Sequence, residues 1–369
     1  MRTRVVLLPD ALEKLGEAPL FERLPAALEE ILSRGGLLRV REAKSNCREA
    51  GWLGLEPNTF QLSEGVLAVA AFDADPPDRS VHFCASILSI MGDEIRTADY
   101  PPSNENIEEL LGQVKRLETS KLKLIVGREM EHALVWEDGS TDLSCKEPSV
   151  AIEQGLRRAL PEGDGETMLR RFLDDSVNLL SELEVNKVRV DEGLNPINLI
   201  WPWGPGLRPR MPNLTVERGT SVRVESPSIR LKGLSKLVGY RHGDPWSLGK
   251  GTNLRLKELA ALVAASPFAI VVLPTIGELR SKEMEEEARW LGREVGLRLL
   301  APLFGEPRNQ PARVILIATQ KCGEGLALDY RSDCPIERRE MRFGAELLED
   351  RKTGSTTLHE LIEEALISR

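Results

Sequence analysis

NLIWPWGPGLRPRMP, at residues 198–212, is the most distinctive segment of this chain, and it has the pattern of neither a helix nor a strand. Two tryptophans stand one residue apart among four prolines and two glycines, so we expect a rigid loop of fixed shape. Trp201 and Trp203 are open to two interpretations, a substrate wall or packing at the edge of a sheet. Packing is favoured, because each ring contributes a large buried area.

The size and charge of the chain limit its number of domains and its class of partners. Its 369 residues are too many for one compact core and predict about two domains. No apolar run approaches the roughly 20 residues that span a bilayer, and the first apolar run is expected to be a strand and not a leader. We therefore expect a cytoplasmic protein. The net charge of −9, with acids and bases mixed, argues against a nucleic-acid or membrane partner.

Three continuous apolar runs are predicted to be central strands of a parallel sheet covered by helices on both faces. They are RVVLLP (4–9), FAIVVLP (268–274) and RVILIAT (313–319). Helical periodicity follows each of them, at 20–36, 281–296 and 356–368. The two ends of the chain thus predict one α/β domain.

The middle of the chain has a mixed pattern. We expect two strands within 64–92, a helix at 104–117, strands at 122–126 and 132–136, and a long helix at 165–183. This pattern predicts an inserted α+β domain. The proposed division is an α/β core of residues 1–62 and 190–369, with residues 63–189 as the insertion.

Residues 185–214, VNKVRVDEGLNPINLIWPWGPGLRPRMPNL, resemble a segment of the archaeal-type cofactor-independent phosphoglycerate mutases. That family pattern reads V-N-x-x-R-x-x-G-x-N-P-A-N-M-I-W-x-W-G-x-G-x-x-P-x-L-P. LLPDALEKLGEAPLFE (7–22) and SNCREAGWLGLEP (45–57) are similar to two further family segments. The family belongs to the alkaline phosphatase superfamily. The resemblance implies a doubly wound α/β core sheet with a smaller inserted domain, in agreement with the pattern above.

The resemblance also implies a chemistry. In the family, a serine takes the phosphoryl group of 3-phosphoglycerate and returns it to form 2-phosphoglycerate. Two divalent ions, Mn or Zn, activate the serine and neutralise the transferring phosphoryl oxygens. The nucleophile position corresponds to Ser45 and the first metal ligand to Asp10, while Asn46 stands where the family has an aspartate.

The other positions of the family's metal ligands carry neutral residues here. They are Gly277, Ser281, Thr319, Gln320 and Tyr330. A single carboxylate cannot hold two divalent ions, because each ion needs several ligands. We therefore expect no metal cofactor. Asp10 is then a remnant that ends the first strand, and Ser45 caps a helix that begins near Cys47. A relocated metal site using Cys322, Asp329 or Cys334 is a weaker alternative.

Several basic residues correspond to basic positions of the family and are candidates for substrate binding. They are Arg208, Lys232 and Lys257, to which we add Arg241 and His132. Guanidinium groups bind phosphate and carboxylate in a bidentate fashion, so a retained anion pocket without metals is physically reasonable. Solvated surface bases are the equally open alternative.

The leading hypothesis is a phosphoglycerate mutase-like protein without mutase activity, which binds a small phosphorylated or carboxylated ligand or a protein partner. The alternative is an active mutase that uses Ser45 and Mn or Zn. A third hypothesis is a new metal-independent activity. Fold alone does not decide among them, since function lies in the site.

Overall fold

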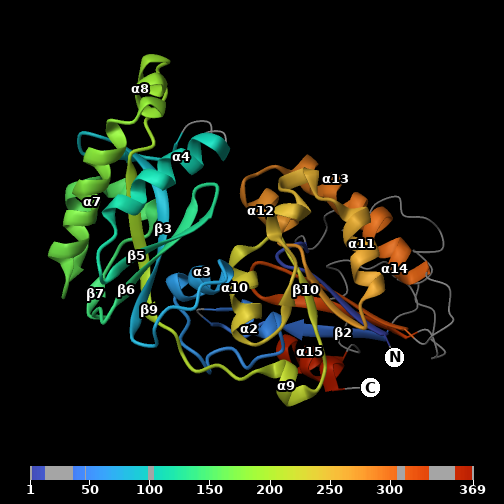
Figure 1. Cartoon of the computed structure of the whole chain (residues 1–369). Helices are drawn as coiled ribbons and strands as arrows, with labels where there is room; N and C mark the ends of the chain where they lie inside the picture. Colours follow the sequence, from blue (N-terminus) through green and yellow to red (C-terminus); the bar gives the residue numbers. More distant parts are fainter. Residues whose placement is uncertain are drawn as a thin grey trace. The chain divides into compact units, whose positions relative to one another are not determined.

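The computed structural model describes residues 2–12, 36–45, 47–98, 104–305, 312–331 and 354–367. The chain divides into two compact units, a larger one of residues 1–60 and 211–369 and a smaller one of residues 61–210 (Figure 1). The proposed division of the sequence placed residues 190–210 in the larger unit. In the structure, a strand in this segment pairs with a strand of the smaller unit, as described below.

An eight-stranded sheet with the order β11-β10-β12-β1-β13-β14-β2-β15 forms the larger unit. The strands are β1 (Arg2–Leu8), β2 (Gly36–Arg41), β10 (Arg223–Glu225), β11 (Arg241–His242), β12 (Phe268–Val272), β13 (Ala312–Thr319), β14 (Glu324–Arg331) and β15 (Gly354–Thr357). The three strands predicted from continuous apolar runs are β1, β12 and β13, and they pair in parallel at the centre of the sheet. Their burial on both faces explains why they read as unbroken apolar runs.

β14 is antiparallel to both of its neighbours, so the sheet is mixed. A tight turn at residues 320–323 joins β13 to β14, and Gly323 adopts φ 85° there, a conformation that favours glycine. Because of this reversal, the end of β14 lies opposite the beginning of β13. Arg331 and Tyr330 are thereby opposite Arg313 and Val314.

Helices cover both faces of this sheet (Figure 1). They are α2 (Glu49–Trp52), α9 (Leu214–Arg218), α10 (Ile229–Leu237), α11 (Leu256–Ala265), α12 (Thr275–Ser281), α13 (Glu285–Val295), α14 (Ala301–Gly305) and α15 (Leu358–Ile367), with short 3-10 turns at Pro245–Leu248 and Gly251–Asn253 and a π-helical turn at Gly296–Leu300. Helices α11 to α14 pack on Val6, Leu8 and Val271 in one apolar core. The predicted helix at 281–296 is broken between α12 and α13, and the one at 356–368 begins at Leu358. The predicted helix at 20–36 lies outside the described residues, apart from Gly36 in β2.

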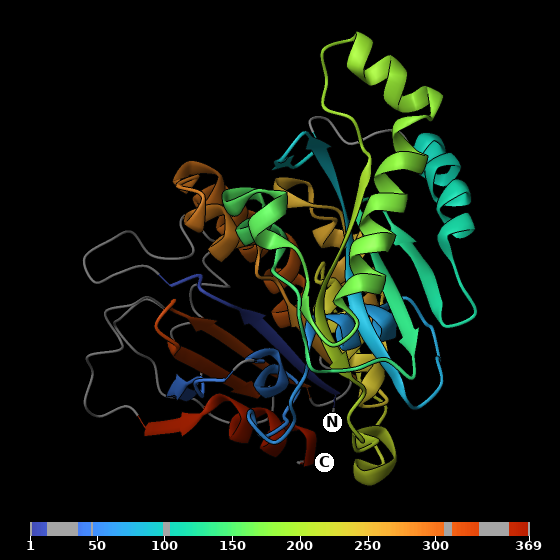
Figure 2. The ribbon, with the colours of Figure 1, turned by 90° about the vertical axis from the view of Figure 1, so that its left-hand side faces the viewer.

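The smaller unit is built on a five-stranded antiparallel sheet (Figure 2). Its elements are α3 (Glu64–Ala71), β3 (Ser80–Met91), β4 (Glu94–Arg96), α4 (Asn104–Val114), a 3-10 turn (Lys115–Leu117), β5 (Leu122–Arg128), β6 (Glu131–Glu137), β7 (Leu143–Ser144), α5 (Pro148–Gln154), α6 (Leu156–Ala159), β8 (Glu162–Gly163), α7 (Glu166–Ser181), α8 (Glu184–Asp191) and β9 (Leu199–Leu207). Helices α4 and α7 pack on one face of the sheet through Leu110, Leu169 and Phe172. Helix α3 packs on the other face through Ala68 and Val69. None of the helices in the described ranges is long and apolar enough to cross a bilayer.

Two expectations for this unit are wrong. Residues 64–71 form helix α3 and not a strand, because the Ser63 hydroxyl caps the helix by accepting a hydrogen bond from Val66 N at 3.3 Å. Residues 199–207 form strand β9 and not a loop. Among the described strands, β9 pairs only with β3, so it is an edge strand, where prolines without an N–H are tolerated.

The tryptophans of β9 are packing residues. Trp201 is fully buried, and its indole N–H donates to the carbonyl of Lys146 at 2.8 Å. The indole N–H of Trp203 donates to the Ser86 hydroxyl at 2.9 Å. Trp201 thus buries its whole ring and Trp203 part of its ring, while the N–H of each is satisfied.

The contact between α3 and β3 requires a glycine at position 65. A Cβ added there would overlap the backbone carbonyl of His82 and the Cα of Phe83. Gly65→Ala is therefore expected to lower the free energy of unfolding by about 1–3 kcal/mol or more through overpacking. The control is Gly112→Ala in α4, where an added Cβ meets nothing within 4 Å, and a gain of about 0.5–1 kcal/mol is expected. Urea unfolding of both variants checks this, and equal effects of the two would contradict it.

Candidate functional site

Asp10, the candidate metal ligand, lies directly beyond the end of β1 and is bound by an arginine. Arg48 donates two hydrogen bonds to its carboxylate, from Nη1 to Oδ1 at 2.9 Å and from Nη2 to Oδ2 at 2.7 Å. Asp10 has φ 56° and its backbone N–H donates to the Thr319 hydroxyl at 3.2 Å, which fixes its position beside the end of β13. Both oxygens of the carboxylate are thus engaged in a bidentate, charge-assisted pair.

A second carboxylate, that of Glu42, forms an ion pair with the same guanidinium. It follows β2, its side chain is only 7% exposed, and its Oε2 is 3.8 Å from Nη1 of Arg48. Its Oε1 accepts hydrogen bonds from the indole N–H of Trp52 at 3.0 Å and from the Thr319 hydroxyl at 3.4 Å. The Trp52 ring lies 5.1 Å from the Arg48 guanidinium carbon. We name Asp10, Glu42, Arg48, Trp52 and Thr319 the arginine cluster.

The electrostatics of the arginine cluster keep the guanidinium charged. The hydrogen bonds that Arg48 donates to Asp10 are the largest cause that raises the pKa of Arg48. Burial opposes this effect, whereas the charges of Asp10 and Glu42 add to it. Burial raises the pKa of Glu42, although the Trp52 bond and the Arg48 charge oppose that effect. The cluster stands where the carboxyl ends of β1 and β13 meet, which is the edge at which α/β folds bind ligands.

Ser45 precedes helix α2 but does not cap it directly. Its hydroxyl accepts a hydrogen bond from Cys47 N at 3.1 Å, and α2 begins only at Glu49. Ser45 therefore closes the turn that leads into the helix. Burial, followed by the charge of Glu49, raises the pKa of the Cys47 thiol to about 11, so this neighbour is a protonated thiol near neutral pH.

Helix α2 is anchored to α10 by a second ion pair. Arg230 Nε donates to Oε1 of Glu49 at 2.9 Å, and the Glu49 side chain is only 12% exposed. Burial alone would raise the pKa of Glu49, but the charge and hydrogen bond of Arg230 hold it below its usual value. This pair fixes the helix that presents Arg48.

Of the other predicted ligand positions, Gly277 lies against Asp10 but offers no side chain to a metal. At Gly277, in α12, an added Cβ would lie 2.6 Å from Asp10 Cβ and 2.7 Å from the carbonyl oxygen of Pro9. A larger side chain there would force Asp10 to move. The hydroxyl of Ser281 donates to the carbonyl of Glu278 at 2.8 Å, within its own helix.

Tyr330 lies away from the arginine cluster. It pairs with Val314, five residues before Thr319 on β13, which corresponds to about 16 Å at about 3.3 Å per residue. Its ring packs edge to face on Phe304, with centroids 5.5 Å apart. The resemblance assigned the last metal ligand to this position, and the antiparallel course of β14 carries it to the other end of the sheet.

The alternative metal site is not assembled in the described residues. Asp329 is opposite Ile315 and is held by Arg313 in a bidentate pair, with distances of 3.0 and 2.7 Å. Cys322 lies exposed in the turn between β13 and β14, and Cys334 is outside the described residues. Within the described part of the chain, no group of three His, Cys, Asp or Glu residues is placed to hold a metal ion.

Two of the predicted substrate-binding residues belong to the smaller unit. Arg208 forms an exposed ion pair with Asp75 at 3.0 Å. His132 is buried in the β5–β6 hairpin, where Nδ1 accepts from Gly127 N and Nε2 donates to the carbonyl of Glu129, both at 3.0 Å. Burial lowers the pKa of His132 to about 4, so its ring is neutral and both nitrogens are engaged near pH 7.

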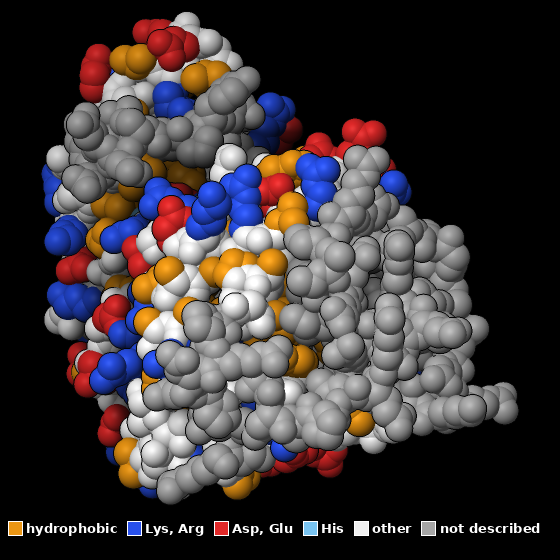
Figure 3. Space-filling model, turned by 90° about the vertical axis from the view of Figure 1, so that its right-hand side faces the viewer, with side chains coloured by type: hydrophobic (Ala, Val, Ile, Leu, Met, Phe, Trp, Pro, Cys, Tyr) orange, Lys and Arg blue, Asp and Glu red, His pale blue; other side chains and the backbone are white. Residues whose placement is uncertain are grey.

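The other three predicted residues lie on separate elements of the larger unit. Lys232 is on α10, with Nζ 5.7 Å from the Trp246 ring centroid, whereas Arg241 opens β11 and Lys257 is exposed on α11. The face in Figure 3 shows Lys and Arg side chains interspersed with Asp and Glu over its described part.

Sequence reasoning missed Arg48 and noted His242 only as a neighbour of Arg241. His242 is mostly buried, and its Nδ1 donates to the carbonyl of Gly243 at 2.6 Å. Burial, followed by the nearby charges of Lys232, Lys236 and Arg223, lowers its pKa to about 4. Positive charge therefore does gather locally, between α10, β10 and β11. Arg48 could have been found from the sequence by its place three residues after Ser45, the candidate nucleophile, in SNCREAGW.

The ion pair of Arg48 and Asp10 is expected to be energetically coupled. Arg48→Ala and Asp10→Asn should each destabilise the protein, and the double variant should lose less than their sum. About a third of the Arg48 side chain is exposed, so we expect a discounted coupling of about 1–2 kcal/mol. Denaturant unfolding of the four proteins measures it, and strictly additive effects would refute the coupling.

Three histidines whose pKa values are lowered by burial predict acid sensitivity. Burial is the first cause that lowers the pKa of His82, His132 and His242 to about 4 from the usual 6.5. Their neutral forms stabilise the fold above pH 6.5, and this contribution is lost as the pH falls toward 4, by about 3 kcal/mol each at about 1.4 kcal/mol per pKa unit. Unfolding measured across this range should show a shallower pH dependence in His132→Gln by about one proton. An unchanged slope would count against this assignment.

The chain was compared in sequence and in structure with known proteins. No family model matches the chain. The 2,3-bisphosphoglycerate-independent phosphoglycerate mutase of Methanothrix thermoacetophila is 29% identical over 228 residues, covering 60% of this chain and 57% of that protein. The corresponding Methanosarcina mazei mutase is 25% identical over 327 residues, covering 83% and 81%. With the first two relatives, the matched part spans 57% and 48% of the relative, or about half its length.

Two solved structures share the fold over nearly the whole chain. The cofactor-independent phosphoglycerate mutase of Thermoplasma acidophilum has a TM-score of 0.61 at 16% identity, with 100% of both chains covered. A Pyrococcus horikoshii protein has a TM-score of 0.72 at 12% identity, covering 99% of this chain and 97% of that one. At such identities the structures bear on the fold alone, which is the alkaline-phosphatase-like α/β fold. Together with the sequence matches, they show that the chain is similar to cofactor-independent phosphoglycerate mutases in sequence and in fold.

Proposed function

We propose that this protein is a phosphoglycerate mutase homologue that has lost the two-metal phosphoryl transfer and binds a small phosphorylated or carboxylated acid without converting it. The observation that carries the proposal is the bidentate pair between Arg48 and Asp10. A guanidinium supplies positive charge to the carboxylate that a metal would need as a ligand.

The donor set beside Asp10 does not fit two divalent cations. Each cation requires several oxygen, nitrogen or sulfur ligands. Glu42 is the other carboxylate of the arginine cluster, and it is already bound by Trp52 and Thr319. Gly277 has no side chain and no room for one while Asp10 keeps its position. These contacts support a site in which an internal cation has replaced the metals.

The surroundings of Ser45 support the same conclusion. A serine hydroxyl is a weak nucleophile and needs a metal or a base to activate it. The Ser45 hydroxyl accepts a hydrogen bond from Cys47 N, which stabilises the turn and does not remove a proton from the hydroxyl. The adjacent Cys47 thiol is not a base at neutral pH, because its pKa is about 11.

Binding of an anion is supported by the charges around His242. Lys232 and Lys236 lie one helical turn apart on α10, and together with Arg223 on β10 they help to lower the pKa of the histidine. Arg223 is partly neutralised by the buried Glu225, whose Oε1 is 2.5 Å from Arg223 Nε. A phosphate or carboxylate near α10 would therefore meet a favourable potential.

The proposal predicts no mutase turnover. Purified protein supplied with 3-phosphoglycerate and with Mn or Zn should yield no 2-phosphoglycerate in a coupled assay, because the donor set cannot hold both ions. Ser45→Ala should behave like the unmodified protein. Metal-dependent turnover that disappears in Ser45→Ala would instead establish the active mutase.

A second experiment tests ligand binding by thermal stability. 3-Phosphoglycerate at about ten times its Kd should stabilise the native state by about 1.4 kcal/mol, seen as a rise in Tm without turnover. Lys232→Ala with Lys236→Ala should reduce the rise, whereas Lys123→Ala, an exposed lysine paired with Glu118 in the smaller unit, should not. An unchanged Tm in the unmodified protein would count against a role in binding this acid.

A further inference from the structure

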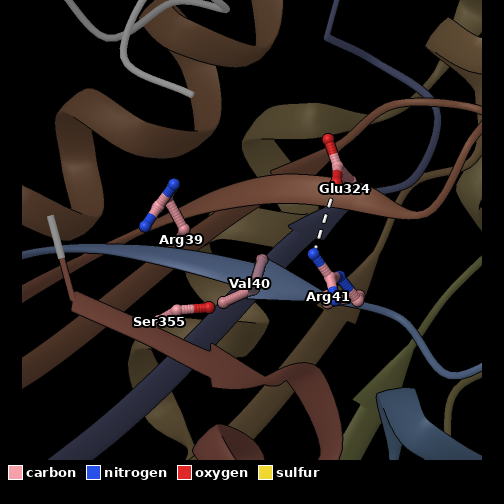
Figure 4. Close-up of a pocket in the computed structure, with 5 residues that line it drawn as sticks. All are labelled: Arg39, Val40, Arg41, Glu324 and Ser355. Atoms are coloured by element: carbon pink, nitrogen blue, oxygen red, sulfur yellow. Dashed lines mark hydrogen bonds and ion pairs between the residues drawn. The ribbon is translucent and has the colours of Figure 1, made fainter. Parts of the chain in front are cut away.

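A pocket separate from the arginine cluster lies on three neighbouring strands of the larger unit (Figure 4). Its volume is about 110 Å³, and it is lined by Arg39, Val40, Arg41, Glu324 and Ser355. Arg39 is in register with Ser355 on β15, and Arg41 is in register with Glu324 on β14. Neighbours in register point to the same face of a sheet, so the two arginines, the glutamate and the serine border one opening.

Arg39 is the side chain that sets this pocket apart. Its Nε is buried and has no hydrogen-bond acceptor among the described residues. A buried charged donor that is left unbonded is unfavourable, because it has lost water without gaining a partner. Figure 4 shows Arg39 and Arg41 on the same side of β2, and only Arg41 is joined to Glu324.

The charge balance of the pocket favours an anion. Two guanidinium groups face one carboxylate, which leaves a net positive charge, and the Ser355 hydroxyl adds a further hydrogen-bond donor. The pair of Arg41 with Glu324 is long, at 3.5 Å, and its side chains are 74% and 54% exposed. Such a pair is weak and can be exchanged for a stronger bidentate contact with a ligand.

The size of the pocket restricts the ligand. A volume of about 110 Å³ leaves room for one tetrahedral or planar oxyanion group. We propose that the pocket formed by Arg39, Arg41 and Ser355 binds a small oxyanion, such as the phosphoryl or carboxylate group of a metabolite. This inference goes beyond the proposed function, since it holds whether or not the protein turns over phosphoglycerate.

The test is calorimetric titration of the full chain with inorganic phosphate and, in a second arm at equal ionic strength, with acetate. Arg39→Ala should weaken binding of the preferred anion at least tenfold, because it removes the guanidinium whose Nε has no acceptor in the described chain. Glu324→Gln should strengthen binding several-fold, because it frees Arg41 and removes a repelling charge. The matched control is Arg96→Ala, which removes an exposed arginine paired with Glu94 in the smaller unit and should leave the affinity unchanged.

Binding of either anion that depends on Arg39 supports the site, and the arm with the higher affinity identifies the preferred group. No binding of either anion, equal affinity in Arg39→Ala, or weaker binding in Glu324→Gln would overturn it. Should Arg39→Ala fail to fold, the tighter binding expected of Glu324→Gln and the weaker binding expected of Ser355→Ala decide the matter. Because no arm measures turnover, the outcome is distinct from that of the mutase assay.

Discussion

The pairing of Arg48 with Asp10 joins parts of the chain that are distant in sequence. Asp10 follows the central strand β1, and Arg48 lies at the beginning of α2. Through Thr319 and Glu42, the same cluster reaches the ends of β13 and β2. Two carboxylates meeting at a sheet edge would repel each other, so a positive charge between them is a condition of this arrangement. A guanidinium meets that condition with planar hydrogen bonds and remains charged at any physiological pH.

This arrangement makes α2 part of the site. The helix has only four residues and could not persist by its own propensity. It is held at one side by Glu49 and Arg230 and at the other by the Trp52 indole, which donates to Glu42. The proposed loss of the metals then requires no change in the surrounding fold, because an arginine that is already fixed by these contacts supplies the charge. In this view the scaffold and the chemistry separate, as they do in other widely used folds.

The success of the sequence analysis followed the physical basis of each pattern. The strands β1, β12 and β13 were predictable because a strand buried on both faces needs an unbroken apolar run. β9 was missed because prolines normally exclude a central strand, and the sequence does not reveal that this strand is at an edge. Helix α3 was missed although its cap, Ser63, was visible. The partner of Asp10 was missed because a contact across 38 residues depends on tertiary structure.

Arg48 and Arg39 show that one residue type can have its charge compensated at one site and left uncompensated at another. Arg48 is matched by carboxylates and lies beside an indole ring, so its charge is compensated within the protein. Arg39 has a buried Nε without an acceptor in the described chain, and its neighbour Arg41 is only weakly paired. Buried charge must be compensated from inside or from outside. At Arg48 the fold itself compensates the positive charge, so a ligand would gain little there. At Arg39 it does not, and an anion from solution has both the space and the charge to bind.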